Sequence, residues 1–315
     1  MPAYNCETTI RKAVESLQAQ TAPDLEIIVV DDGSTDGTGD LVETMAGKDA
    51  RIKLVRLEIN LGVGNARKVA IDNVTGDWLT MLDADDWYEP NRVEVLLNAC
   101  LELNADVVFD NLQIYDHVLK RVVYCTRFSK SKKALAFKKE DLFRLDNPLR
   151  PSSVGYAQPM FRTKFLREHK INYGTSYRIG EDFIFLADFV LSGARAFMIP
   201  EAYYVYVHRT SPSTNKISPF SRSATRIAEI VQASDDLRQK YAATMSAEAQ
   251  RLLLRRKRIF ENFIVAQNMK EAVRQGQFIK AALLILKCPF ILLFVATNLY
   301  RRVRAKVRLH LMGAR

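Results

Sequence analysis

Apolar positions in the first 110 residues alternate between two patterns, and the alternation predicts a mostly parallel sheet flanked by helices. Short apolar runs typical of buried strands lie at 25–30, 52–57, 78–82 and 106–110. Between them, apolar residues follow helical spacing at about 8–20, 39–46, 64–73 and 90–103. Because strand–helix alternation at this spacing builds parallel sheets covered on both faces, we expect an α/β fold.

Beyond residue 110 the pattern becomes mixed and then wholly helical. Strands are predicted at 121–125 and 195–199 and helices at 161–169 and 181–191, before a polar, Ser- and Pro-rich loop at 210–219. Long helical patterns fill 220–275. The sequence therefore predicts three parts, namely residues 1–110, residues 111–215 and a helical C-terminal extension at residues 216–315.

Two acidic clusters directly follow apolar runs. Asp31-Asp32 and Asp83-Ala84-Asp85-Asp86 would meet at the carboxyl edge of the sheet, where such folds bind ligands. Crowded carboxylates suit a hard divalent cation, Mg²⁺ or Mn²⁺, that also takes phosphate oxygens. A solvated acidic turn that caps the helix starting near Pro90 would explain the second cluster as well.

Three further segments have both a functional and a plain structural interpretation. The segment from Asn60 to Arg67 could approach phosphates or form a tight turn with a surface arginine. Glu181-Asp182 could hold a general base or simply favour the helix dipole. His208 follows the strand-like segment Tyr204 to Val207, opens the polar loop, and could be a ligand or a structural histidine.

The net charge of +10 is concentrated at the C-terminal end of the 315-residue chain. Residues 251–315 contain fifteen Lys/Arg and two acids, whereas the preceding 250 residues carry a net charge of −3. This distribution predicts that one appendage meets an anionic surface, and no basic stripe for nucleic acid is found on the body.

The basic end combines charge with apolar residues. Residues 281–286 and 288–300 are apolar, but charged residues and Pro289 interrupt them, so neither run reaches the roughly 20 residues that span a bilayer. We expect an interfacial helix on anionic lipid; the alternative is a helix packed on the body.

Cysteine usage and the N-terminal residues bear on the compartment. The four cysteines at 6, 100, 125 and 288 show no pairing or metal-ligand spacing, and the first residues have no signal-peptide pattern. We therefore expect reduced thiols in a cytoplasmic protein that is peripheral on the inner face of the cell membrane.

Four motifs in order over about ninety residues resemble the family 2 glycosyltransferases of GT-A fold, of the bacterial polysaccharide-biosynthesis type. They are Pro2-Ala3-Tyr4-Asn5, Val30 to Thr38 (VDDGSTDGT), Asn60 to Arg67 (NLGVGNAR) and Gly76 to Asp86 (GDWLTMLDADD). The resemblance implies that residues 1–110 bind the nucleotide sugar and that residues 111–215 form the acceptor and catalytic half.

The resemblance also implies roles for single residues. Donor-binding roles fall on Pro2, Tyr4, Asp32, Arg67, Asp83 and Asp85, with Tyr4 and Asp32 at the base and Asp83 at the ribose. Asp85 matches the metal ligand, with His208 as a further candidate ligand near the diphosphate. Asp182 matches the general base of the inverting members, and Glu181 is the fallback.

The chain departs from the family pattern at three places. Tyr206 and Lys68 replace an arginine and an asparagine common in members, and neither change touches the acids. Met1 directly precedes Pro2, where members usually carry an apolar strand, so we expect that the natural start codon lies upstream.

Taken together, the sequence predicts an inverting, metal-dependent glycosyltransferase. Its donor would be a nucleoside-diphosphate sugar, with a UDP-sugar favoured, its cofactor Mn²⁺ or Mg²⁺, and its acceptor a lipid-linked saccharide in exopolysaccharide or cell-surface synthesis. The alternatives are a non-catalytic nucleotide-sugar-binding relative and a nucleotidyltransferase.

Overall fold

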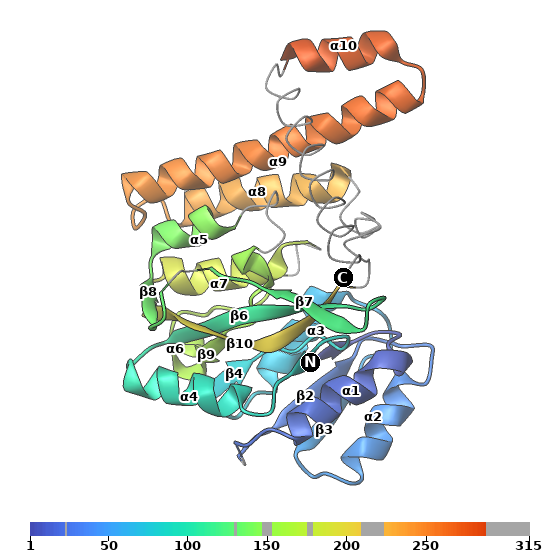
Figure 1. The fold of residues 1–315 in the computed structure, drawn as a ribbon, viewed down its shortest axis with the longest axis vertical. Coiled ribbons are helices and arrows are strands. Elements are labelled where there is room, and N and C mark those ends of the chain that lie inside the picture. Colours follow the sequence, from blue (N-terminus) through green and yellow to red (C-terminus); the bar gives the residue numbers. More distant parts are fainter. Residues whose placement is uncertain (23, 129–130, 147–152, 175–178, 209–223, 288–315) are drawn as a thin grey trace, which may run out of the picture.

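The computed structural model of the chain describes residues 1–22, 24–128, 131–146, 153–174, 179–208 and 224–287 (Figure 1). The predicted loop at 210–219 and the basic end at 288–315 lie outside these ranges, as does the side chain of His208.

A three-stranded parallel sheet forms the N-terminal part. Its order is β1 (Pro2–Ala3), β2 (Ile27–Asp31) and β3 (Ile52–Arg56). Successive side chains of β2 belong to different apolar clusters. Val29 belongs to a cluster with residues of α1 (Glu7–Gln18) and α2 (Thr38–Ala46), and Val30 belongs to one with residues of α3 (Val63–Asp72). This explains why β2 is apolar throughout, since both of its faces are buried.

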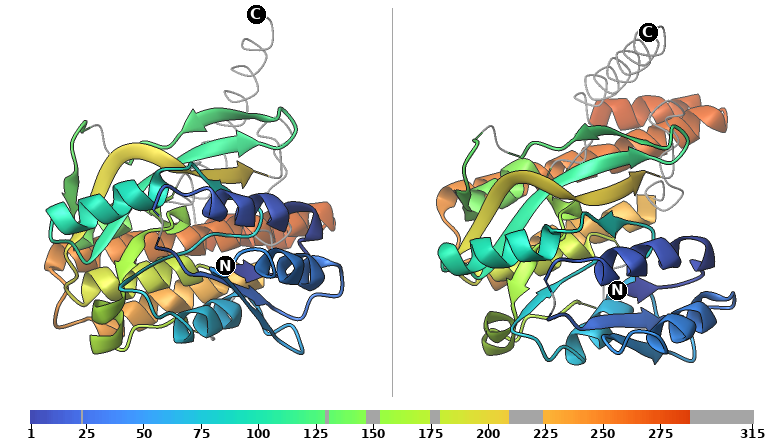
Figure 2. Two further views of the ribbon diagram at one scale, coloured as in Figure 1. Left: turned by 90° about the horizontal axis from the view of Figure 1, so that it is seen from below. Right: turned by 60° about the horizontal axis from the view of Figure 1, so that its bottom comes forward.

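The second sheet has seven strands in the order β4-β9-β6-β10-β5, with β7 on β6 and β8 on β10. The bounds are β4 (Trp78–Thr80), β5 (Trp87–Tyr88), β6 (Val107–Asp116), β7 (Arg121–Cys125), β8 (Leu135–Phe137), β9 (Met160–Arg162) and β10 (Ala196–His208). The long strands β6 and β10 run parallel, and β10 curves alongside β6 in both views of Figure 2. The α/β fold class is confirmed, although short antiparallel strands complete this sheet.

Helices cover both faces of the second sheet. Along β6, Val107 and Phe109 face one core and Val108 and Leu112 face the other, as the pleat of a strand requires. The first core packs on α7 (Glu181–Leu191) and the second on α4 (Arg92–Glu102), which lie on opposite sides of the sheet in Figure 1. The shorter α5 (Lys139–Leu145), the 3₁₀ helix η1 (Val154–Tyr156) and α6 (Thr163–Glu168) complete this half.

The predicted helical C-terminal extension consists of α8 (Ala224–Lys240), α9 (Ala247–Arg274) and α10 (Phe278–Lys287). Helix α9 is anchored by Arg256, whose Nε lies 2.5 Å from Asp146 Oδ2 and whose guanidinium carbon lies 3.7 Å from the ring centre of Phe183. The extension also shares a core with the second sheet, because Leu237 and Leu252 belong to the same apolar cluster as Phe109. Helix α10 lies at the far end of the molecule (Figure 1), and no helix within the described ranges is long and apolar enough to cross a membrane.

Candidate active site

One buried arginine joins the two halves of the predicted site. Arg67 comes from α3, and its side chain is only 2% exposed. Its Nη2 lies 2.6 Å from Asp83 Oδ1, and its Nη1 lies 2.8 Å from Glu181 Oε1 and 2.7 Å from Asp182 Oδ1. The structure thus gathers the predicted ribose-side acid, the predicted base and the fallback base around a single cation.

Asp182 stands in the first turn of α7, at the edge of the buried cluster. Its Oδ1 also accepts a hydrogen bond from the Tyr173 hydroxyl at 2.9 Å. Burial raises the pKa of Asp182 to about 7; Arg67 opposes this rise, and the carboxylates of Glu181 and Asp83 add to it. A carboxylate with a pKa near neutrality suits a general base, because it both ionises and accepts a proton at working pH.

The acidic segment between β4 and β5 is crowded, as expected from its sequence. Asp86 is buried; its Oδ2 accepts a hydrogen bond from the Tyr204 hydroxyl and its Oδ1 one from the Val207 N–H, each at 2.7 Å. Burial raises the pKa of Asp86 well above its usual range, and the charges of Asp85 and Asp83 raise it further. A divalent cation would offset this repulsion, and carboxylate oxygens are the ligands that Mg²⁺ and Mn²⁺ prefer, so the residues fit such an ion.

The ligands for this ion remain a prediction. In the described part of the chain no group of three or more His, Cys, Asp or Glu side chains is arranged to hold a metal. A donor-bound Mg²⁺ or Mn²⁺ needs fewer, because one or two carboxylates and the substrate phosphates share the coordination. The side chain of Asp85 is partly exposed. His208 is the residue after Val207, whose backbone N–H donates a hydrogen bond to Asp86.

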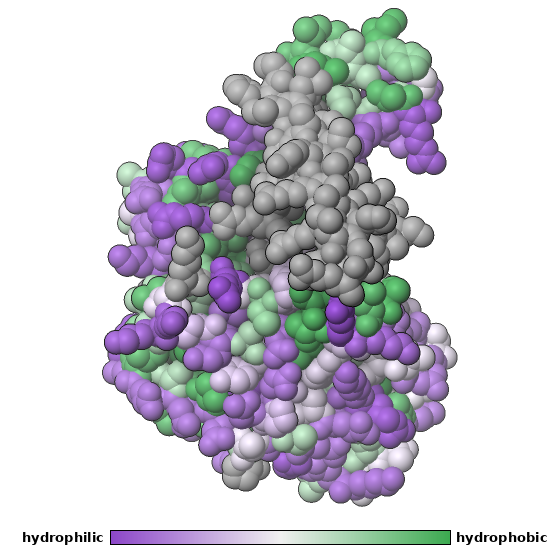
Figure 3. Space-filling model, viewed as in Figure 1, coloured by the Kyte–Doolittle hydropathy of each residue, from purple (hydrophilic) through white to green (hydrophobic). Residues whose placement is uncertain are grey.

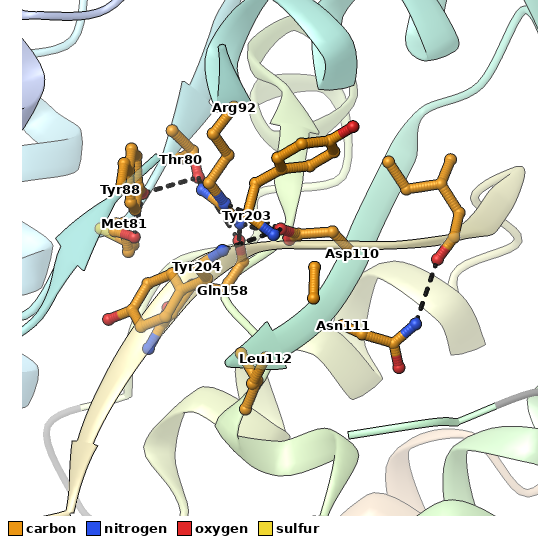
Figure 4. A network of polar contacts seen from close by, with 12 residues as sticks. Thr80, Met81, Tyr88, Arg92, Asp110, Asn111, Leu112, Gln158, Tyr203 and Tyr204 are labelled. Carbon is orange, nitrogen blue, oxygen red and sulfur yellow. Dashed lines mark hydrogen bonds and ion pairs between the residues drawn. The ribbon is translucent and has the colours of Figure 1, made fainter. Parts of the chain in front are cut away.

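A buried polar network fixes the strands that carry this segment (Figure 4). Arg92 of α4 pairs with Asp110 of β6 at 2.8 Å, and Asp110 Oδ2 accepts hydrogen bonds from the backbone N–H groups of Tyr203 and Tyr204 at 2.9 and 3.1 Å. Tyr204 then reaches Asp86 through its hydroxyl. The acidic segment is therefore held from β6 and β10 as well as by its own strand.

The N-terminal motifs are locked to one another by Asp32. Its two carboxylate oxygens accept hydrogen bonds from the backbone N–H groups of Leu61 and Gly62, each at 2.8 Å, so that the loop after β2 holds the loop before α3. Pro2 lies in β1, and Tyr4 follows it with a half-exposed side chain. The donor contacts expected of Pro2, Tyr4 and Asp32 stay predictions.

Sequence reasoning missed several residues that shape the site. Asp110 is the last residue of the strand predicted at 106–110, close to the positions of Asp31 and Asp83 after their strands, and that position could have revealed it. Tyr173 and Tyr204 carry no comparable signal, because neither the polar segment around Tyr173 nor the apolar run around Tyr204 marks a functional tyrosine. The structure joins Asp83 and Asp182 through Arg67, whose burial the sequence does not indicate.

The sequence of the chain is similar to the sequences of known proteins. Residues 1–186 match the family model described as glycosyl transferase family 2. Over 314 residues the chain is 28% identical to the succinoglycan biosynthesis protein ExoO of Rhizobium meliloti (strain 1021), covering 96% of this chain and 84% of that protein. It is 30% identical over 212 residues to the succinoglycan biosynthesis protein ExoU of the same organism, covering 66% of this chain and 60% of that protein.

Solved structures confirm the GT-A fold. The crystal structure of S. aureus TarS 1–349 in complex with UDP superposes with a TM-score of 0.57 at 22% identity, covering 87% of this chain and 90% of that one. The mannosyltransferase PcManGT from Pyrobaculum calidifontis, in complex with GDP-Man and Mn²⁺, superposes with a TM-score of 0.59 at 17% identity, covering 98% and 84%.

Proposed function

Because the chain belongs to glycosyl transferase family 2, we propose that it is an inverting transferase acting on a nucleoside-diphosphate sugar and a saccharide hydroxyl. The observation that carries the proposal is the position of Asp182, whose pKa is raised to about 7, within one ion-pair cluster with Asp83. Inverting transfer needs a base at the attacking hydroxyl and charge compensation at the leaving group. The cluster brings the candidate base to the acidic segment.

In the proposed reaction Asp182 takes the proton of the acceptor hydroxyl as its oxygen attacks the anomeric carbon from the face opposite the diphosphate. Glu181 is the fallback base; its carboxylate is also bound to Arg67, at 2.8 Å. A divalent cation at Asp85, with His208 as a candidate second ligand, would supply positive charge for the departing diphosphate. Tyr4, Asp32 and Asp83 would hold the donor. Arg67 and Tyr173 keep the carboxylate of Asp182 oriented.

The proposed donor is a UDP-sugar with Mn²⁺ or Mg²⁺. Support comes from the solved TarS structures, which are complexes with UDP and with UDP-GlcNAc, and from the PcManGT complex, which contains Mn²⁺. Tyr4 and Asp32 would contact the base and Asp83 the ribose, in keeping with their places at the ends of β1, β2 and β4.

The proposed acceptor is a lipid-linked saccharide in exopolysaccharide or cell-surface synthesis, met at the cytoplasmic face of the membrane. Both succinoglycan relatives are named for the biosynthesis of a polysaccharide. The apolar side chains of Phe278 and Ile279 on α10 are 68% and 80% exposed, and apolar residues gather on α10 in Figure 3. Such a helix beside a basic segment suits an anionic lipid surface.

A thermal-shift panel tests the proposal directly. The probes are UDP-glucose, UDP-galactose, UDP-GlcNAc and GDP-mannose, each with and without Mn²⁺. A donor at 100 times its Kd should stabilise the fold by about 2.7 kcal/mol. Asp85→Ala should abolish the Mn²⁺-dependent part, whereas Asp24→Ala, at an exposed carboxylate outside the site, should keep it. Equal stabilisation of the Asp85→Ala variant would contradict the metal assignment.

A further inference from the structure

Arg67 is built into the protein differently from an arginine that binds phosphate at a surface. Its side chain is 2% exposed, and both Nη atoms are taken by carboxylates of Asp83, Glu181 and Asp182. Its Nε is buried and has no hydrogen-bond partner in the part of the chain that the structure describes. The orientation of the guanidinium is thus set by the acids, and little of its surface is left for a donor phosphate.

We propose that Arg67 is a positioning residue that orients Asp182, favours its ionised form, and ties it to the donor-side Asp83. The proposal rests on the proposed function, in which Asp182 is the base. It replaces the phosphate contact expected of Arg67 from its motif.

The contacts assign separate tasks to the two oxygens of Asp182. Arg67 Nη1 and the Tyr173 hydroxyl both contact Oδ1, at 2.7 and 2.9 Å. The guanidinium carbon also lies 5.4 Å from the ring centre of Tyr173, so the two residues support each other. With Oδ1 held by two donors, Oδ2 is the oxygen that accepts the proton from the acceptor.

The charges around Asp182 make Arg67 necessary for its ionisation. Glu181 and Asp83 are negative and raise the pKa of Asp182, and Arg67 is the cation that lowers it. The Tyr173 hydroxyl lowers it by donating a hydrogen bond. Without Arg67 three carboxylates would share the site, and Asp182 would hold its proton at neutral pH.

The test is a titration of Asp182 that needs no substrate. Protein labelled with ¹³C at the aspartate carboxyl carbons is followed by NMR across pH, and Asp182→Asn identifies the signal. Because an opposite charge at this distance lowers a carboxyl pKa by about 1–3 units, Arg67→Met should raise the midpoint by a similar amount. Arg67→Lys keeps the charge and should raise it less. Arg162→Met, which breaks a separate ion pair with Asp106, is the matched control and should leave it unchanged.

Two further measurements keep the outcome decisive. If Arg67→Met does not fold, Arg67→Lys and Tyr173→Phe take its place, and each should raise the midpoint of Asp182. Unchanged midpoints in the folded variants would overturn the proposal. With the donor found in the thermal-shift panel, the acid limb of turnover should move with the NMR midpoint. Failure of every donor to bind or turn over would instead reject the proposed function and leave the titration result standing.

Discussion

At the scale of single residues, the adjacent carboxylates of Glu181 and Asp182 differ in their surroundings. Both carboxylates pair with Arg67, but of the two only Asp182 also accepts a hydrogen bond from the Tyr173 hydroxyl. Asp182→Asn should therefore keep donor binding while transfer falls roughly 10²–10⁴-fold, the range for loss of a general base. Glu181→Gln is the matched variant and should lose less. Steady-state transfer and donor calorimetry measure both, and near-normal transfer by Asp182→Asn would move the base to Glu181.

The raised pKa of Asp182 sets the direction of the pH profile. The base acts in its ionised form, and its pKa in the folded protein is about 7. Donor-saturated turnover should thus rise as pH increases through about 7 and fall tenfold per unit below it. A pH–rate profile at fixed ionic strength measures this. An acid limb centred near pH 4 would show that burial does not raise the pKa of the catalytic base.

Gly33 permits the close approach of the loops after β2 and β3. Its φ is +69°, and a Cβ there would stand 2.6 Å from the carbonyl carbon of Ile59. Gly33→Ala should destabilise the fold by about 1–3 kcal/mol, the usual cost of such strain. Gly47→Ala is the control, since an added Cβ there meets nothing closer than 3.7 Å. Urea unfolding compares the two, and equal midpoints would mean that the loop shifts at no cost.

Sequence patterns indicated the acids of the candidate site more directly than the contacts of its basic and aromatic residues. Asp32, Asp83 and Asp182 stand next to strand ends or helix starts, and those positions can be read along one segment. The ion pair between Arg67 and Asp182 joins residues 115 positions apart in α3 and α7, and no local pattern encodes it. Tyr173 was missed for the same reason.

At the scale of elements, the regular helices followed from periodicity, whereas the two longest strands, β6 and β10, were predicted only in part, at 106–110 and 195–199. The predicted helix at 181–191 matches α7, and the predicted strand at 52–57 matches β3. The three-residue strands β8 and β9 were missed, because three residues are too few to show a period of two. Residues 160–162, at the edge of a predicted helix, instead form β9 because β4 and β6 both pair with them.

Helix α9 should stabilise the part of the chain that carries Asp182 through one side chain. Arg256 is buried against Asp146 and Phe183, the residue after Asp182. Arg256→Met leaves a buried carboxylate without its cation, so we expect a loss of about 3–5 kcal/mol. Arg255→Met removes an exposed neighbouring charge and should cost little. Denaturant unfolding measures the free energy of unfolding of both variants. Similar values would mean that the carboxylate of Asp146 does not depend on the charge of Arg256.

At the scale of the whole molecule, the basic C-terminal end and α10 should act together on a membrane. Deleting residues 277–315 should release the protein from anionic vesicles and leave hydrolysis of a soluble donor intact. Each lysine or arginine at an anionic surface contributes about 1 kcal/mol, so binding should weaken with salt. Apolar side chains such as Ile279 should leave a salt-insensitive remainder.

Vesicle flotation across a salt series decides this prediction. The control is Ile279→Ser with Leu286→Ser, which keeps every charge and should remove mainly the salt-insensitive part, since both side chains are largely exposed. If the full-length and truncated chains float equally, or neither floats, the C-terminal end is a packing element instead.

The parallel pairing of β6 with β10 has a consequence for synthesis on the ribosome. Residues 117–195 separate the two strands, so β6 emerges long before its parallel partner exists. Until then it can pair only with nearby strands such as β7, and contacts of high sequence separation form slowly. Arg67 and Asp83 likewise leave the ribosome well before Asp182. The nascent chain therefore passes through a stage in which the first sheet is complete, the candidate active site is half formed and β6 lacks its parallel partner; partly folded states of this kind are prone to aggregation.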